Sequence, residues 1–173
     1  MATEQKTEFW LSAPIAGIIP MLQPVAHAIL QAQREIHEAL ENFPGGLIWQ
    51  RPAGVASVAF HLQHLAGVLD RLFTYARGEE LSALQLDTLQ QEGQENKDLE
   101  LDGLLSQLNQ QVSISLEQLQ LTPQELLLET RYVGRKQIPS NVLGLLFHAG
   151  EHTSRHTGQL LVTARIVKSN MNL

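Results

Sequence analysis

The sequence predicts an all-α protein, a four-helix bundle in which a long connection joins the second and third helices. Three observations lead to this fold class: four long segments repeat apolar residues every three or four positions, no segment alternates convincingly as a strand does, and the chain has no internal repeat. Its 173 residues suffice for one core, and 43% of them are hydrophobic against 17% charged. We therefore expect a single domain over residues 1–173.

The first two predicted helices are bounded by proline and glycine. The first helix runs from Pro24, a residue suited to a first helical position, to Leu40, and a Pro-Gly-Gly sequence at 44–46 stops it. The second helix begins with the periodic run at Val58 and ends near Gly78, since glycine is a common C-terminal stop.

The remaining elements include one long connection. Residues 79–98 are rich in Gln and Glu and contain four leucines, which predicts a short helix inside the connection. An antiparallel helix hairpin needs fewer residues, so a crossover can let the second and third helices run parallel. A third helix is predicted at 99–121, and residues 125–139 fit either a short helix or an extended excursion. Pro139-Ser140-Asn141 opens the last helix, which runs through Val167.

Composition argues against several functional classes. The formal net charge is -6 and Lys and Arg are scattered singly, so no basic stripe that would bind nucleic acid is present. The absence of cysteine excludes disulfides, thiolate ligands and a cysteine nucleophile, and it fits a reducing compartment. No run reaches the roughly 18 apolar residues of a membrane span. We expect a cytoplasmic protein without nucleic-acid or membrane partners.

An export signal is the alternative for the N-terminus. The apolar residues 13–22 precede Ala26-His27-Ala28, which imitates a small-residue cleavage site. Against this, Glu4 and Glu8 outnumber the single Lys6, and Pro14, Pro20 and Pro24 interrupt what should be a smooth apolar helix.

The histidines carry the main functional signal. Five of the seven fall into two clusters, His61 and His64 on the second predicted helix and His148, His152 and His156 on the last. Residues four apart lie on one helix face about 6 Å apart, so His152 and His156 can bind one ion. His148 and His156 are about 12 Å apart and cannot share it. A third ligand must come from another helix, and helical geometry leaves both His61 and His64 open.

Other interpretations are weaker. The clustered histidines could be ordinary core or boundary residues, and we expect that role for the isolated His27 and His37. No Glu-x-x-His pair occurs twice at matching positions, which disfavours a di-iron site. No phosphate-binding glycine motif and no nucleophile-elbow serine occurs, and Ser154 is expected to be a bystander.

Two stretches resemble motifs of the DinB/YfiT-like superfamily of metal-dependent enzymes. The first is residues 57–66, Ser-Val-Ala-Phe-His-Leu-Gln-His-Leu-Ala, followed by Asp-Arg-Leu at 70–72. The second is residues 152–159, His-Thr-Ser-Arg-His-Thr-Gly-Gln, with the recurrent pair of histidines four apart and the trailing Gly-Gln. The similarity runs from about Trp49 to Val167.

The resemblance implies one metal ligand from the first motif and two from the second, which map onto His64, His152 and His156. His61 and His148 are extra to this pattern and are candidates for supporting the ligands or lining a pocket. The resemblance also implies a four-helix bundle, often a homodimer, with zinc or nickel in the site. Characterised relatives include transferases and isomerases that use low-molecular-weight thiols, and metal-binding domains of larger enzymes.

Three neutral imidazoles leave a divalent ion with its full charge and an open position, as in catalytic zinc sites. Water or a thiol bound at the open position ionises more readily, so the site suits hydrolysis and thiol transfer equally well. Gln159 shares the helix face of His152 and His156 and could orient a ligand or substrate. Arg71 and Tyr75 share the face of His64 and could receive an anionic substrate group, although a solvated Arg and a core Tyr are the more common roles.

The resulting hypothesis is a metal-dependent hydrolase or low-molecular-weight-thiol S-transferase that acts on a small molecule. The alternative is a non-catalytic metal-binding or dimerising bundle. A fourth protein ligand that seals the ion would favour the alternative, and an open position beside an accessible pocket would favour the enzyme.

Overall fold

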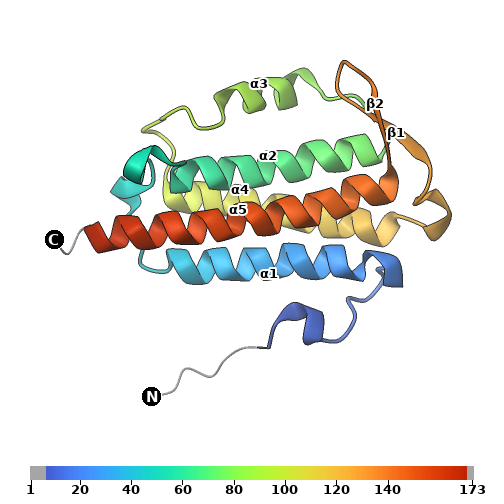
Figure 1. The fold of residues 1–173 in the computed structure, drawn as a ribbon, viewed down its shortest axis with the longest axis horizontal. Coiled ribbons are helices and arrows are strands. Elements are labelled where there is room, and N and C mark those ends of the chain that lie inside the picture. Colours follow the sequence, from blue (N-terminus) through green and yellow to red (C-terminus); the bar gives the residue numbers. More distant parts are fainter. Residues whose placement is uncertain (1–6, 171–173) are drawn as a thin grey trace.

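The computed structural model describes residues 7–170, and four long helices pack side by side in it (Figure 1). They are α1 (Gln23–Leu40), α2 (Val58–Ala76), α4 (Leu101–Leu121) and α5 (Val142–Asn170). Both α1 and α2 contact α4 and α5, so each helix has two long neighbours. The predicted all-α four-helix bundle is confirmed, and the helices lie where the apolar periodicity placed them.

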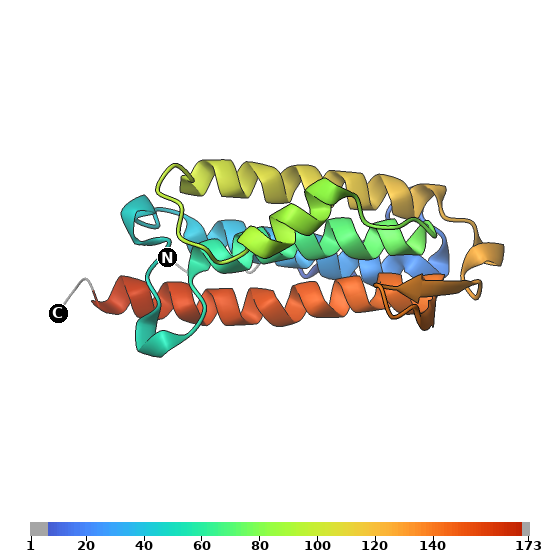
Figure 2. The same cartoon turned by 90° about the horizontal axis from the view of Figure 1, so that it is seen from above.

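The connection between α2 and α4 is the crossover that its length allows. Figures 1 and 2 show α2 and α4 running in the same direction, with α1 and α5 opposite to them. The connection carries α3 (Ala83–Gln91) and returns along the outer side of α2. Ser82 and Gln85 cap α3 reciprocally: Ser82 Oγ accepts from the Gln85 amide at 3.2 Å, and Gln85 Oε1 accepts from the Ser82 amide at 2.8 Å.

The segment that sequence reasoning left open contains a small hairpin. Strands β1 (Thr130–Val133) and β2 (Ile138–Asn141) pair antiparallel, with Thr130 opposite Asn141. Short 3-10 helices lie before α1, between α1 and α2, and between α4 and β1. They are η1 (Phe9–Leu11), η2 (Pro20–Leu22), η3 (Gly45–Leu47), η4 (Pro52–Gly54) and η5 (Gln124–Leu126).

The expected opening of the last helix at Pro139-Ser140-Asn141 is wrong by three residues. These residues pair with β1, and α5 begins only at Val142. Asn141 then serves as the cap, because its Oδ1 accepts a hydrogen bond from the Gly144 amide at 2.7 Å.

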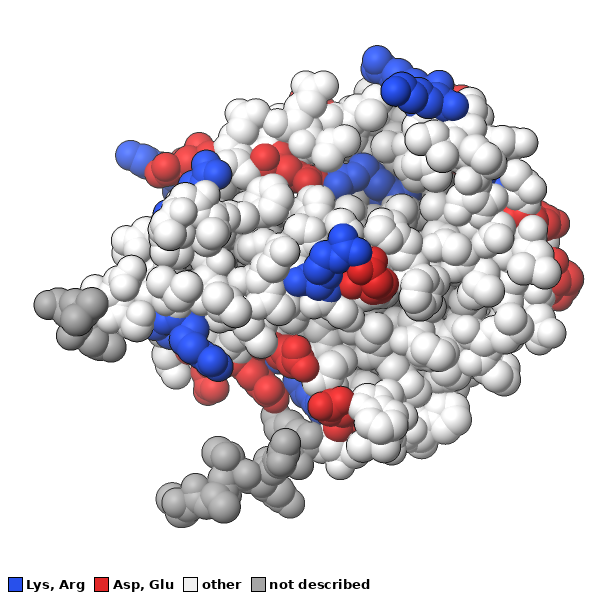
Figure 3. All heavy atoms as spheres, in the orientation of Figure 1, with Lys and Arg blue, Asp and Glu red and all other residues white. Residues whose placement is uncertain are grey.

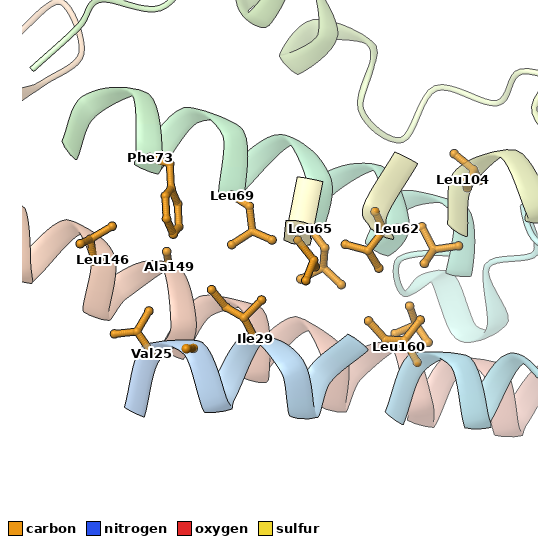
Figure 4. Packing of buried hydrophobic residues seen from close by; sticks show 14 of the residues in the cluster. Val25, Ile29, Leu62, Leu65, Leu69, Phe73, Leu104, Leu146, Ala149 and Leu160 are labelled. Atoms are coloured by element: carbon orange, nitrogen blue, oxygen red, sulfur yellow. The ribbon is translucent and has the colours of Figure 1, made fainter. Parts of the chain in front are cut away.

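The core fills the space between the four helices. The α2 residues Leu62, Leu65, Leu69 and Phe73 are at most 1% exposed and point toward α1 and α5 (Figure 4). Burying each such side chain stabilises the fold by about 1.5 to 3 kcal/mol. Because this stripe fixes the rotation of α2, it also fixes the direction in which the neighbouring histidines of α2 point.

The surface agrees with the scattered charges of the sequence. On the face shown in Figure 3, Lys and Arg form small separated groups, several of them beside Asp or Glu. Within residues 7–170, no helix has both the length and the apolar character needed to cross a membrane.

Candidate metal centre

Three histidines from two helices converge at the boundary between α2 and α5. One ring nitrogen each of His64, His152 and His156 lies within 4.8 Å of the other two. The His64 and His152 Nε2 atoms are 2.9 Å apart, and the ring centroid of His156 is 4.4 Å and 4.5 Å from those of His64 and His152. Two nitrogens bound to one ion at about 2.05 Å are about 2.9 to 3.4 Å apart. The spacing therefore fits one shared divalent ion.

Helix geometry explains the convergence. His152 and His156 are one turn apart on α5, and His64 approaches from α2, whose capped start is fixed by a hydrogen bond from the Phe60 amide to Ser57 Oγ at 3.1 Å. All three rings are half-buried, which shields the site without closing it.

A buried carboxylate orients His64. Glu92 Oε2 lies 2.7 Å from His64 Nδ1, and Glu92 Oε1 accepts from Arg71 Nη1 at 2.6 Å. An ionised carboxylate only accepts, so a neutral His64 carries its proton on Nδ1 and leaves the Nε2 lone pair facing His152. Burial raises the pKa of Glu92, but hydrogen bonds from His64 and Arg71 outweigh it and hold the pKa below its usual value.

His61 is buried behind the three-histidine group, where its ring lies against His156. It is 2% exposed, and its Nδ1 lies 3.3 Å from Nδ1 of His156. If His156 donates from Nδ1 to His61, its Nε2 is left for an ion. Burial, followed by charge on His156 and His64, lowers the pKa of His61 to about 4, so the ring stays neutral at neutral pH. Of the two histidines left open on α2, the structure brings His64 into the three-histidine group and sets His61 behind it.

The two α5 histidines are also held neutral. Burial, followed by charge on His156 and His64, lowers the pKa of His152 to about 4. Burial, then His64 and Arg155, lower the pKa of His156. The Nδ1 atom of His152 is buried and has no hydrogen-bond partner among the described residues. Imidazoles with converging nitrogens are, in their neutral form, a donor set that suits zinc or nickel.

Two of the other candidate residues are held away from the three nitrogens. Arg71 is buried rather than solvated, at 7% exposed, because Glu92 binds its guanidinium. Tyr75 is half-buried against the core and lines a cavity with Arg131 and Tyr132, to which none of the three histidines contributes.

The remaining candidates lie on the outer side of α5. His148 is exposed, its Nδ1 is 3.3 Å from Glu151 Oε2, and its ring centroid is 5.2 Å from that of His152. Gln159 and Ser154 are exposed, and the Ser154 hydroxyl donates to the Gly150 carbonyl at 3.0 Å.

The isolated histidines lie apart from the cluster. His37 is exposed, and its Nε2 is 2.8 Å from Asn109 Oδ1. His27 is half-buried and lines a shallow cavity with Trp10 and Thr157.

Sequence reasoning missed the residues that surround His64. Glu92 lies 28 positions along the chain, in a connection without a recognisable motif. Phe60 stacks on the His64 ring, with centroids 5.2 Å apart and planes 10° from parallel. Gly67 offered the only signal, because a glycine inside a helix weakens it and so points to a close approach.

Comparisons with known proteins agree with this fold. A family model described as the DinB superfamily matches residues 28–160, which reach from α1 into α5. A solved structure of a protein from Streptococcus pneumoniae is similar, with a TM-score of 0.61 at 19% identity over 84% of this chain and 88% of that chain. Likeness at that identity shows the fold alone. None of the curated proteins matches the chain in sequence.

Proposed function

Because the chain belongs to the DinB superfamily, we propose that it binds one divalent metal ion through His64, His152 and His156 and acts as a metal-dependent enzyme on a small molecule. The observation that carries this proposal is the convergence of three ligand nitrogens within 4.8 Å of one another. Imidazole is a common ligand of both zinc and nickel, and these are the metals we propose.

The open side of the group favours catalysis over a purely structural ion. Within residues 7–170, the group that spans the two helices consists of three histidines, and a second group on α5, His148, Glu151 and His152, shares only His152 with it. Glu92 is engaged by His64 and Arg71, and His61 lies against His156. Three protein ligands with a position left open are typical of catalytic zinc sites, whereas structural sites have four.

The bound ion would supply Lewis-acid chemistry that favours ionisation of water or of a low-molecular-weight thiol. The chain's own residues prepare the site for it. Glu92 keeps the proton of His64 on Nδ1, and Arg71 balances the carboxylate's charge, so the pair adds no net negative charge beside the ligands. Hydrolysis and thiol S-transfer are the two reaction classes that this arrangement serves.

Metal content is the first test. Protein purified without a histidine tag is stripped with a chelator and titrated separately with zinc and nickel. We expect about one ion per chain, and failure to bind either metal at neutral pH would refute the proposal. The loaded protein is then screened with small thiols combined with electrophiles, and with esters and amides.

A non-catalytic metal-binding or dimerising bundle is the alternative. A fourth protein ligand that seals the ion would favour it, whereas the group of His64, His152 and His156 supplies three. We also propose a homodimer, which a measurement of molecular mass in solution tests independently of the metal.

A further inference from the structure

We propose that Glu92 is a positioning residue for His64, so that the crossover connection between α2 and α4 forms part of the metal site. This inference rests on the proposed function of the three histidines, but it concerns residues outside their motifs. It assigns a role to a connection whose length a helical bundle does not need by itself.

Both carboxylate oxygens of Glu92 are in use. Oε2 is 2.7 Å from His64 Nδ1 and Oε1 is 2.6 Å from Arg71 Nη1, so the carboxylate is held at two points. The side chains of Glu92 and Arg71 are 5% and 9% exposed, which keeps water from competing strongly for these bonds. An arginine that fixes a carboxylate against a histidine leaves the histidine one favourable ring orientation and one tautomer.

Helix α2 leaves room for this pair at Gly67. A Cβ atom built there would lie 2.4 Å from Glu92 Oε1 and 2.6 Å from Arg71 Nη1, closer than such atoms approach. His64, Gly67 and Arg71 follow one another at spacings of three and four, so they share one face of α2. Because Gly67 has no side chain, this face has room for the Glu92 carboxylate between His64 and Arg71.

The backbone after Glu92 is fixed to the same face. Gly93 has a φ of +78°, and its amide donates to Gln63 Oε1 at 3.0 Å. A Cβ at Gly93 would lie 2.8 Å from Cδ2 of Phe60, whose ring stacks on His64. Side chains of one helix face therefore hold both residues of the Glu92-Gly93 segment against the histidine.

Without Glu92, His64 is free to carry its proton on Nε2, the nitrogen that faces His152. A protonated Nε2 has no lone pair for a metal, so tautomer exchange and ring rotation both lower the fraction of chains that are ready to bind. The expected consequence is weaker metal binding at an otherwise folded site.

The test compares Glu92→Gln and Glu92→Ala with Glu95→Gln, which makes the same charge change at an exposed position of the same connection. The affinity for zinc is measured by competition with a chelator, and circular dichroism checks folding. We expect both Glu92 variants to bind zinc about 10- to 100-fold more weakly than wild type. We expect Glu95→Gln to bind like wild type.

A second measurement needs no metal. Long-range nitrogen NMR of the metal-free protein at pH 8 reports which nitrogen of His64 carries the proton, and we expect Nδ1 in wild type and a loss of this preference in Glu92→Ala. Equal zinc affinity in all variants, or a proton on Nε2 of wild-type His64, would overturn the role of Glu92. Absence of zinc binding in wild type would refute the proposed function, and the tautomer would still decide the role of Glu92.

Discussion

Replacing Gly67 by alanine should separate metal binding from fold stability. The new Cβ would lie 2.4 Å from Glu92 Oε1, whereas ordinary contact begins at 3.4 Å, so the carboxylate must move by about 1 Å. That shift is comparable to the margin between a good hydrogen bond and none, and the His64 Nδ1 to Glu92 contact of 2.7 Å should be lost or distorted.

The substitution should weaken metal binding and leave the stability of the metal-free protein nearly unchanged. Loss of support for a ligand histidine weakens metal binding about 10- to 100-fold, which corresponds to about 1.4 to 2.7 kcal/mol. Alanine inside a helix is more favourable than glycine by about 1 kcal/mol. The atoms that the new methyl group would meet are at the ends of the flexible Glu92 and Arg71 side chains. These side chains can therefore shift and form their ion pair again in a slightly different position. The metal-free Gly67→Ala protein should therefore be about as stable as wild type.

The assay is a zinc competition titration together with urea unfolding of the metal-free protein. Gly103→Ala is the control, because a Cβ at that α4 position meets nothing within 4 Å and α4 contains no histidine. If Gly67→Ala binds zinc as tightly as Gly103→Ala, the reasoning about Glu92 is refuted.

Three further predictions concern the ligands, the metal and the pH. His64→Ala and His152→Ala should each abolish tight zinc binding in a calorimetric titration, whereas His37→Ala, at an exposed position, should bind normally; the reverse pattern would contradict the ligand assignment. Chelation should leave a helical, cooperatively unfolding protein, and free zinc at one hundred times its dissociation constant should add about 2.7 kcal/mol to the free energy of unfolding; loss of the circular dichroism spectrum on chelation would indicate a structural ion. Folded-state pKa values of about 4 for His61 and His152, below the ordinary 6.5, mean that the unfolded chain binds more protons between these values, so metal-free stability should fall as the pH drops from about 6.5 toward 4. A urea midpoint that does not change over that range would contradict this last expectation.

The long helices could be predicted because their apolar spacing reports directly which face is buried. The predicted start at Pro24 and the observed start of α1 at Gln23 differ by one residue. The hairpin could not be predicted, since its strands have four residues each and β2 contains Pro139, which a strand tolerates only at an edge. The pairing of β2 with β1 depends on contacts between the two strands, and the residue pattern of either strand alone does not predict it.

The histidine cluster was partly visible in the sequence for a similar reason. A spacing of four places His152 and His156 on one face of a helix, but a spacing of three leaves His61 and His64 equivalent. The structure separates them, because the core stripe of α2 turns His61 inward to 2% exposure and leaves His64 at the boundary with α5. Glu92 hydrogen-bonds to His64 and not to His61, and it lies 28 positions from His64 in the connection between α2 and α4. A short sequence motif cannot predict a contact over that distance.

X-ray absorption spectroscopy of the zinc-loaded, untagged protein tests the central claim most directly, because it reports the ligands of the ion. We expect about one zinc ion per chain with three imidazole nitrogens at about 2.0 to 2.1 Å and one solvent oxygen in the remaining position. The imidazole signal should fall to two rings or disappear in His64→Ala. A wild-type spectrum dominated by carboxylate oxygens, or one with four protein ligands around the ion, would contradict an open three-histidine site.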